Sequence, residues 1–556
     1  MKKITKVALL LLVALLSVAL LSACLGGNDT KEDESTTESQ TEPETAPHFH
    51  EYTGEWTVVT EPTCAAEGLR EIACACGEKK SAAIPTNSNH ALDENAVCTA
   101  CGKDLREDFT FELNAAGDGY IVKEYRRNEG NMDIEHMVIP ATYEGKPVTA
   151  IGHLGFSNND ELKSLTIPTT VTSIRQGSLF YYCDNVETVT IKEGNPVYHS
   201  VDNCIIETAT KTLVVGCKTG VIPADGSVTA IGNNAFANCS NLTEIVIPEG
   251  IVSIGSSVFV GCEELTQVTL PDSLTSIGAG AFQGSGLTEL AIPRNVLDIG
   301  TYMISACPNL ESVTVSELNP KYHSAGNCII ETAGKTLLMG CKASVIPADD
   351  SVTLIAIQAF FNCSGLTEIT IPASVAKIDS LAFSGCTGLT TLEIDNGLVE
   401  IGGGAFRDCI SLTSVALPNS VELVGSTAFE GCTSVTSVTF GSGLETVKYD
   451  AFRNCTALTN VNMGYSVTTI EDGVFKGCTA LQSITIPASV SLMAEGVFGA
   501  CTSLTAVTFL DPAGWQYVVN ADNDEYEDLP EADLADPATA AIYLTSTYVD
   551  RTWSNH

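Results

Sequence analysis

The sequence predicts a β-rich solenoid of 23-residue repeats, with a parallel β-sheet face and short helical turns, preceded by a small Cys/His module. Three observations support this fold class. One phrase returns from about residue 150 to residue 510, its apolar positions recur every 23 residues, and a cysteine-rich segment precedes it. A fixed period in the twenties is typical of a solenoid whose turns bury their apolar faces only against their neighbours.

The N-terminus has the pattern of an export signal. Lys2, Lys3 and Lys6 precede an apolar run over residues 7–21, and small residues lead to Cys24. A basic start, an apolar middle and a small-residue exit are the features of a secretory signal. A transmembrane anchor is the alternative, because the run is nearly long enough to span a bilayer. The lack of a basic cluster after Cys24 argues against it.

The Leu-Ser-Ala-Cys ending at Cys24 resembles a lipobox. This resemblance implies a lipoprotein signal peptide over residues 1–23 and a diacylglyceryl group on Cys24, because two acyl chains are enough for stable anchoring. The protein would be exported and held by lipid on the outer face of a bacterial cell membrane. Residues 24–47 would then be the lipid anchor and an acidic tether without aromatic side chains, which we expect to be disordered.

The charge of the chain limits its partners. It has 28 basic and 68 acidic residues, a formal net charge of −40. Nucleic acids and anionic lipid surfaces need a basic footprint. We therefore expect no nucleic-acid partner.

Residues 48–106 form the Cys/His-rich module. In its Cys-x-x-Cys-Gly segment, residues 98–102, two thiolates can share one metal ion and the glycine permits a tight turn. An earlier Cys-x-Cys-Gly segment has one intervening residue fewer, and the pair of segments resembles a zinc ribbon. The preferred ligands of one structural zinc are Cys74, Cys76, Cys98 and Cys101. His90, His50 and Cys64 are possible substitutes, and disulfides within an extracellular module are the alternative.

Residues 107–149 are expected to cap a solenoid over residues 150–510. Within one turn, Leu366, Ile369 and Ile371 give the alternation of a short strand, and Pro372 ends it. A second extended piece and a single helical turn follow. In nine turns a phenylalanine precedes a cysteine by three residues, which predicts an aromatic column along the core. Because cysteine packs as a small buried hydrophobe, we expect these thiols to be free.

The repeated phrase is Leu-x-x-Ile-x-Ile-Pro, then Val-x-x-Ile-Gly, then Ala-Phe-x-x-Cys. It resembles the BspA-like class of leucine-rich repeats of bacterial surface proteins, over roughly 360 residues. The resemblance implies a β-rich leucine-rich-repeat solenoid, display at the cell surface and, in some members, adhesion to host proteins.

Two inserts interrupt the repeats. Residues 195–222 (the first island) match residues 319–346 (the second island) at an offset of 124. Each is expected to be a β-hairpin that projects from the solenoid and contributes Tyr198 or Tyr322 to a binding site, or merely a duplicated stabilising hairpin. Cys204 with Cys217, and Cys328 with Cys341, are candidate disulfides within them.

The outward residues of the Leu-x-x-Ile-x-Ile strands are the candidate binding face. They are polar and rich in threonine, which also suits a half-exposed strand by β-propensity alone. The residues chosen for this face are Thr367, Glu368, Thr370, Thr390, Thr391 and Glu393.

Residues 511–556 are expected to form a C-terminal cap and an acidic tail, with a helix from Asp536-Pro537 to about Val549. No catalytic motif is present. The predicted function is binding of an extracellular protein. This includes adhesion to proteins of a host or of neighbouring cells. Binding of carbohydrate or envelope polysaccharide is the alternative, and an enzyme is the least favoured reading.

Overall fold

A computed structural model describes residues 51–64, 66–75, 77–84, 90–125, 135–152, 155–156, 159, 161–175, 179, 185–216, 221–520 and 525–555. The predicted signal peptide, Cys24 and the tether lie outside these residues. The chain divides into two compact units, one with Met1–Val59 and Leu69–Ala82, the other with Thr60–Gly68 and Ala83–His556. Among the described residues, no helix has the length and apolar character needed to cross a membrane.

The first unit contains most of a small three-stranded sheet. Its strands are β1 (Thr57–Thr60), β2 (Gly68–Ala73) and β3 (Lys79–Ile84), in that order. Ile72 is buried, and Lys79 forms an exposed ion pair with Glu71 at 2.9 Å.

The second unit begins its stack with a sheet of longer strands. A 3-10 turn at Leu105–Asp108 leads into β4 (Phe109–Leu113) and β5 (Tyr120–Tyr125), which pairs with β8 (Lys146–Ile151), while β7 (Thr142–Tyr143) lies on β8. The aromatic rings of Phe109 and Tyr125 meet edge to face at 5.3 Å. This sheet closes the apolar end of the repeats, as a solenoid cap must.

Each following turn starts with a strand that we call a face strand. Its burial alternates, so that in β27 Ile369 and Ile371 point into the core while Glu368 and Thr370 are exposed. Parallel pairing joins residues of successive turns, such as Glu368 with Thr391. The face strands are β6 (His136–Val138), β9 (Ser164–Ile167), β11 (Thr188–Ile191), β16 (Glu244–Val246), β18 (Gln267–Thr269), β20 (Glu289–Ile292), β22 (Ser312–Val315), β27 (Glu368–Ile371), β29 (Thr391–Ile394), β31 (Ser414–Ala416), β33 (Ser437–Thr439), β35 (Asn460–Asn462), β37 (Ser483–Ile486) and β39 (Ala506–Phe509).

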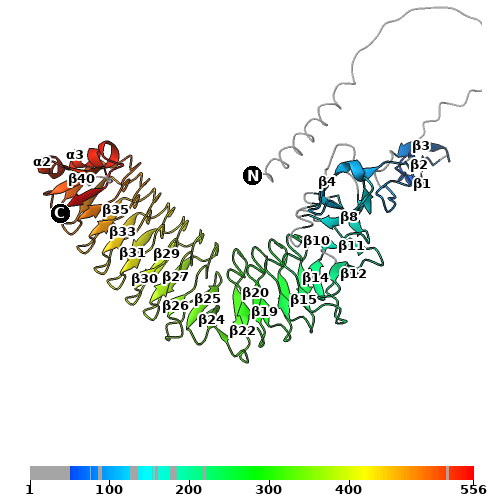
Figure 1. The fold of residues 1–556 in the computed structure, drawn as a ribbon, viewed down its shortest axis with the longest axis horizontal. Helices are drawn as coiled ribbons and strands as arrows, with labels where there is room; N and C mark the ends of the chain where they lie inside the picture. The colour runs from blue at the N-terminus through cyan, green and yellow to red at the C-terminus, as the bar shows by residue number, and fades with distance from the viewer. Residues whose placement is uncertain are drawn as a thin grey trace, which may run out of the picture. The chain divides into compact units, whose positions relative to one another are not determined.

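The second extended piece of each turn is a two-residue strand, which we call a short strand. From β15 on, the short strands stack into the two longest sheets, one of seven strands and one of thirteen, whereas the face strands pair in twos and threes. Figure 1 shows this stacking from cyan to red. The short strands are β10 (Ser173–Ile174), β15 (Ala230–Ile231), β17 (Ser253–Ile254), β19 (Ser276–Ile277), β21 (Asp298–Ile299), β26 (Leu354–Ile355), β28 (Lys377–Ile378), β30 (Glu400–Ile401), β32 (Leu423–Val424), β34 (Thr446–Val447), β36 (Thr469–Ile470) and β38 (Leu492–Met493).

The Ala-Phe-x-x-Cys segment forms the third side of each turn. It is a tight turn closed by i to i−3 backbone hydrogen bonds, such as Cys386 N to Phe383 O at 3.2 Å. The Phe383 N–H also donates to the Ala405 carbonyl of the next turn at 2.7 Å. The predicted short helical turns are therefore present as single hydrogen-bonded turns.

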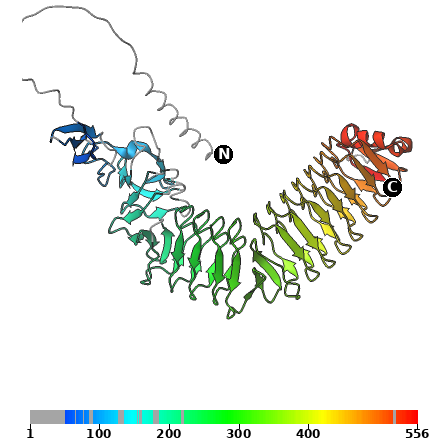
Figure 2. The ribbon, with the colours of Figure 1, turned by 180° about the vertical axis from the view of Figure 1, so that it is seen from behind.

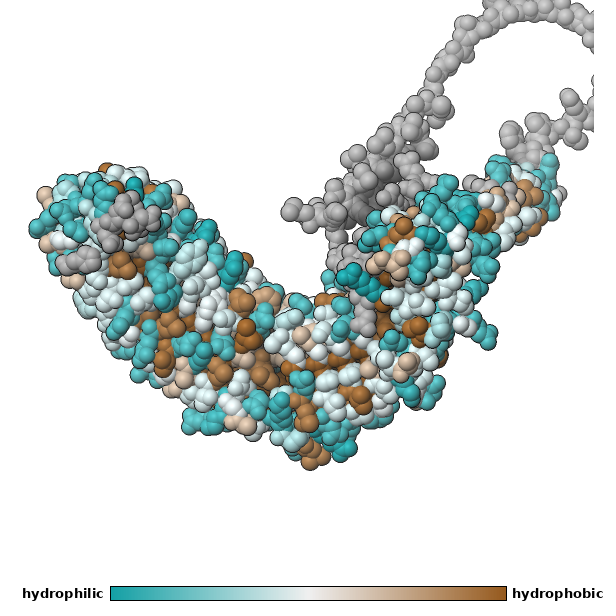
Figure 3. Space-filling model, viewed as in Figure 1, coloured by the Kyte–Doolittle hydropathy of each residue, from teal (hydrophilic) through white to brown (hydrophobic). Residues whose placement is uncertain are grey.

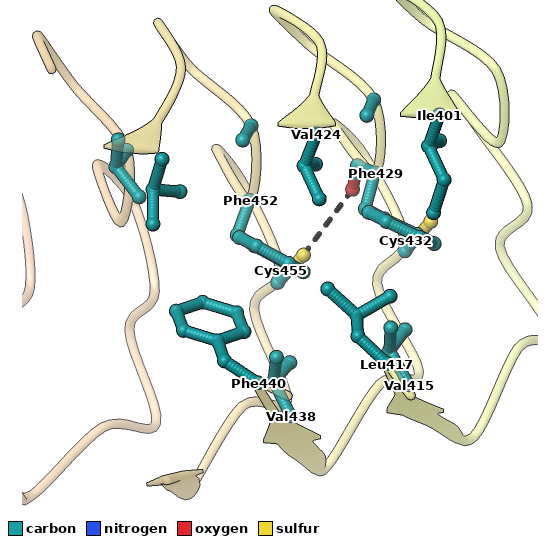
Figure 4. Packing of buried hydrophobic residues seen from close by; sticks show 14 of the residues in the cluster. Ile401, Val415, Leu417, Val424, Phe429, Cys432, Val438, Phe440, Phe452 and Cys455 are labelled. Carbon is teal, nitrogen blue, oxygen red and sulfur yellow. Dashed lines mark hydrogen bonds between the residues drawn. The ribbon is translucent and has the colours of Figure 1, made fainter. Parts of the chain in front are cut away.

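The predicted aromatic column is confirmed. From Phe360 to Phe498 the rings of successive turns stack with centroids 4.8–5.9 Å apart. Apart from Cys239, which is half-buried, the cysteines beside it are buried free thiols. In eight turns the thiol donates to a phenylalanine carbonyl of the preceding turn, as Cys455 does to Phe429 O at 3.3 Å (Figure 4). The eight cysteines of this thiol ladder are Cys262, Cys307, Cys386, Cys409, Cys432, Cys455, Cys478 and Cys501.

The two islands differ from the projecting hairpins that the sequence predicts. Each is a three-stranded antiparallel meander whose last strand pairs in parallel with the next short strand, so each island begins one of the two long sheets. Their strands are β12 (Tyr198–Val201), β13 (Cys204–Glu207) and β14 (Thr212–Val215) in the first island, and β23 (Tyr322–Ala325), β24 (Cys328–Glu331) and β25 (Thr336–Gly340) in the second. Cys328 and Cys341 are free thiols, and Cys217 lies outside the described residues.

The last turns are closed by a small mixed cap, coloured red in Figure 2. Strands β40 (Trp515–Asn520), β41 (Glu525–Asp528) and β42 (Trp553–Asn555) extend the short-strand sheet antiparallel to β38. Two helices, α2 (Glu531–Ala535) and α3 (Pro537–Ile542), follow β41, and a π-helical turn continues α3 over Tyr543–Thr547. The Asp536 side chain accepts from Thr539 N, so the predicted N-cap is confirmed.

Candidate binding face and candidate metal centre

Threonines that directly precede the face strands join successive turns. Thr390 donates through its hydroxyl to the Thr367 carbonyl at 3.0 Å, and Thr413 donates to the Thr390 carbonyl at 3.2 Å. The same bond recurs at Thr436 and Thr459. Threonine at this position therefore contributes to the fold through turn-to-turn hydrogen bonds, a role that β-propensity alone does not describe.

The six predicted face residues lie on the outer surface of two neighbouring turns. Each of them is exposed, and Thr370 donates through its hydroxyl to Glu393 Oε2 at 3.3 Å. Neither Glu368 nor Glu393 forms an ion pair with another described residue. Two carboxylates are thus presented to solvent on β27 and β29 without a compensating cation.

Five of these six residues also line a hollow beside the second island. It has a volume of about 400 Å³ and is bounded on the other side by the exit segment of the island, residues 342–346. The five are Thr367, Glu368, Thr370, Thr391 and Glu393. The structure therefore brings the predicted face together with a segment that follows the second island in sequence.

Tyr198 and Tyr322 were predicted as binding residues, and their burial contradicts this. Only 7% of Tyr198 and 4% of Tyr322 is exposed. The Tyr198 hydroxyl accepts from Ile174 N at 3.1 Å, and the Tyr322 hydroxyl donates to the Leu297 carbonyl at 3.2 Å. Both side chains instead anchor an island to the turn before it.

The segment at residues 98–102 folds as the predicted knuckle. The Gly102 N–H donates to the Cys98 carbonyl at 2.8 Å, and the Cys98 N–H donates to the Lys103 carbonyl at 2.8 Å. Gly102 has a φ of +75°, which favours glycine. Ala96 and Leu105 flank the knuckle and are buried in the same cluster as the first turns of the solenoid.

Four potential ligand atoms of the second unit converge at this knuckle. They belong to Cys64, His90, Cys98 and Cys101 and all lie within 4.8 Å of one another. Cys64 Sγ is 3.5 Å from Cys98 Sγ, and Cys101 Sγ is 3.3 Å from His90 Nδ1. Sulfur atoms at about 2.3 Å from a tetrahedral zinc would be roughly 3.8 Å apart, so these spacings fit a shared ion.

The environment of the knuckle favours a thiolate at Cys98. Burial acts to raise the pKa of Cys98, but it is outweighed by hydrogen bonds from the Cys101 backbone, His90 and the Ala100 backbone, which lower this pKa to about 6. Burial and the neighbouring sulfurs of Cys98 and Cys101 raise the pKa of Cys64 to about 11. A metal ion would relieve that repulsion, because thiolate ligation displaces the proton.

The structure changes the predicted ligand set. Cys98 and Cys101 are in the group, and Cys64 and His90, named as substitutes, take the other two places. Cys74 is disulfide-bonded, so it has no thiolate to offer, and Cys76 lies outside the described residues. Cys64 lies half-buried beside the knuckle, a proximity that spacing along the chain does not reveal.

The fold defines a leucine-rich-repeat solenoid: a stack of parallel strand pairs whose turns are filled by three successive apolar clusters. The sequence model described as the BspA type leucine rich repeat region matches residues 131–225, 229–326, 331–432 and 399–514, in six copies. The chain belongs to this family.

Several solved structures resemble the chain. A leucine rich cell surface protein from Faecalibacterium prausnitzii A2-165 is 30% identical, over 64% of this chain and 93% of that one, with a TM-score of 0.45. A leucine-rich repeat protein from Bacteroides ovatus ATCC 8483 is 23% identical, over 72% of this chain and 87% of its own (TM-score 0.38). The pneumococcal vaccine antigen PcpA is 20% identical, over 72% and 92% (TM-score 0.41). No curated protein matches the chain.

Proposed function

We propose that the chain is a cell-surface protein that binds other proteins through the outer face of its solenoid. The observation that carries this proposal is the exposed polar face of β27 and β29 beside a hollow of about 400 Å³. Solenoids present extended surfaces of this kind to protein partners. Membership of the BspA-type family and the description of the F. prausnitzii relative as a cell surface protein support it.

The proposal includes export and anchoring by a lipid on Cys24. With the chain held at the outer face of the membrane, its ligands would be proteins of a host or of neighbouring cells. The net charge of −40 fits a soluble, non-aggregating surface display and disfavours nucleic acid.

The side chains of the face strands and of the islands support binding rather than catalysis. Within the described residues, the face strands carry threonine and scattered carboxylates, and the histidines at His199 and His323 each bond a threonine hydroxyl of the same island. Sugar binding usually uses exposed aromatic rings for stacking. The chosen face has none.

The test is a binding screen with the full chain, kept in mild detergent so that a lipid anchor is tolerated. Extracellular-matrix proteins and a glycan array are the two sets of probes, at physiological salt. Saturable binding to a protein, competed by the same unlabelled protein, is the expected result. Binding to glycans alone, or to neither set by folded chain, would overturn the proposal.

A second proposal concerns the knuckle. We propose that Cys64, His90, Cys98 and Cys101 hold one zinc ion, because their four ligand atoms converge within 4.8 Å. Four protein ligands close the coordination sphere, so the ion would be structural. It would tie residues 60–68 to residues 90–101.

The zinc content of the purified full chain tests this second proposal directly. The full chain should contain one zinc ion per chain, and exchange of both Cys98 and Cys101 for serine should remove it. Cys409→Ser changes a thiol of the ladder and serves as the control with unchanged zinc. Zinc retained by the double variant, or absent from the parent chain after growth in zinc-supplemented medium, would exclude the site.

A further inference from the structure

The most exposed aliphatic side chains gather at the islands. Among the described residues, the four largest exposures of this class are those of Leu318 (71%), Val345 (69%), Val221 (66%) and Val246 (64%). Leu318 directly precedes the second island, Val221 and Val345 are matching positions at the island exits, and Val246 lies on β16, the first face strand after the first island. Figure 3 shows brown residues gathered over the middle turns of the visible face. Of these four, Val345 borders the hollow beside the second island.

The hollow beside the second island contains the open edge of a sheet. Strand β27 pairs with β29 and with no other described strand. Thr367 and Ile371 bond to β29 through their carbonyls, which accept from Thr391 and Asp395. Because a parallel pairing uses alternate residues, the backbone groups of Glu368 and Thr370 point to the opposite side, toward the island.

The island does not satisfy this edge. The exit segment, residues 342–346, takes the place of a face strand in that turn, but no backbone hydrogen bond joins it to β27 within the described chain. Its own bonds go elsewhere: the Val345 N–H donates to the Gly326 carbonyl at 2.9 Å, and the Ser344 hydroxyl to the Asn327 carbonyl at 2.7 Å. An unpaired strand edge is a template for an added extended segment.

The charges around the hollow determine which kind of extended segment can bind to this edge. Lys342 is already paired with Glu311 at 3.1 Å. Glu368 and Glu393 have no cation of their own among the described residues, and Val345 adds an exposed apolar surface. An extended segment with basic and apolar side chains complements this arrangement.

We propose that the hollow formed by residues 342–346, β27 and β29 binds an extended, basic segment of a partner protein that hydrogen-bonds to the open edge of β27. Main-chain hydrogen bonds supply affinity in this mode of recognition and the side chains supply specificity. Basic side chains pair with Glu368 and Glu393, and an apolar side chain lies on Val345. This inference rests on the proposed function and names the partner chemistry for it.

The first island offers a natural comparison. Strand β16 likewise begins a sheet and pairs only with β18 among the described strands. Strand β18 has Thr269 at the position of Glu393, and β16 has Val246 at the position of Thr370, so only Glu244 remains of the two carboxylates. We infer that the second island binds the basic segment more tightly than the first.

The probe is a fluorescein-labelled octapeptide of alternating lysine and valine, titrated into the full chain and followed by anisotropy. Binding to the parent chain is expected. Glu368→Lys combined with Glu393→Lys should weaken it at least about tenfold, because two ion pairs become repulsions. Glu289→Lys, the same change on exposed residue 289 of β20, should leave the affinity unchanged.

The backbone contribution is separated by the peptide itself. N-methylation of every second residue in one register blocks the donors that face β27 and should weaken binding at least about tenfold, whereas methylation in the other register should not. Equal effects of both registers, no effect of the charge reversal, or no binding by the parent chain would overturn the inference. A protein ligand from the screen that still binds the double lysine variant would leave the proposed function intact and move its site elsewhere.

Discussion

The thiol ladder of the solenoid and the Cys/His group at residue 98 use the same side chain in opposite ways. In the ladder, burial raises the pKa of Cys409 and Cys455 to about 12. At the knuckle, backbone and histidine donors lower the pKa of Cys98 to about 6 despite its burial. Apolar packing therefore raises the pKa of the ladder thiols, while directed hydrogen-bond donors lower the pKa of Cys98.

The difference lies in what surrounds each sulfur. A ladder thiol lies among phenylalanine, valine and isoleucine side chains and donates its proton to one carbonyl, as Cys432 does to Phe406 O at 3.2 Å. The knuckle sulfurs face one another and accept hydrogen bonds. A free thiol in the first setting packs as a small hydrophobe, and a thiolate in the second setting can serve as a metal ligand.

Deletion of a ring should give the largest effect on stability. Phe406 is fully buried between the rings of Phe383 and Phe429, at 5.0 and 5.1 Å. Phe406→Ala should cost about 3–5 kcal/mol of unfolding free energy in urea titrations. The comparison predicts that zinc content stays at its parent value. Loss of zinc from the Phe406→Ala variant would mean that the solenoid core and the Cys/His group are not independent.

Alkaline pH should weaken the ladder next. An unfolded cysteine has a pKa near 8.5, and the folded pKa of Cys262, Cys409 or Cys455 is raised by burial to about 12. Between these values the unfolded state loses protons that the folded state keeps, so stability falls as pH rises from about 9 toward 12.

Each such thiol contributes a loss of about 1.4 kcal/mol per pH unit in that window. Thermal unfolding of the parent chain and of Cys409→Ala, followed from pH 8 to pH 10.5, measures it. The variant should lose less stability over this range. Identical pH profiles would contradict the inference that buried protonated thiols cause the fall.

The exchange of one cysteine for serine, made once in each region, should give the smallest loss of unfolding free energy. Cys432→Ser keeps a donor for the Phe406 carbonyl, and Ser285 already occupies a ladder position beside Phe282. Its cost should be about 1 kcal/mol by urea unfolding. Cys98→Ser should instead release zinc while the solenoid keeps its unfolding midpoint. A larger loss of unfolding free energy for Cys432→Ser than for Phe406→Ala would contradict this order of effects.

The repeated parts of the fold were predictable because their signals are periodic. Phe383 and Cys386 recur at the same spacing in successive turns, and this period predicts both the aromatic column and the thiol ladder. The exposure of Glu368 and Glu393 follows from the alternation of side chains along a strand. The Asp536 cap follows from local turn chemistry. Each of these rests on residues near one another in sequence or repeated at one interval.

The islands and the ligand set could not be predicted in the same way. The continuous apolar run at residues 204–206, all three buried, is typical of a strand covered on both faces and pointed away from a projecting hairpin. The burial of Tyr198 depends on its antiparallel register with Glu207, which no motif gives. Cys64 reaches Cys98 across 34 residues, so its role is visible only in space.

Thiol alkylation of the full chain, mapped by peptide mass spectrometry, tests the central contrast most directly. Folded chain would be treated with iodoacetamide at pH 7.5 with and without a zinc chelator. We predict that Cys64, Cys98 and Cys101 are protected until the chelator is added, and that the eight ladder cysteines react only after unfolding in urea. Labelling of ladder cysteines in the folded chain, or equal labelling of the knuckle with and without chelator, would contradict the division into packing thiols and metal ligands.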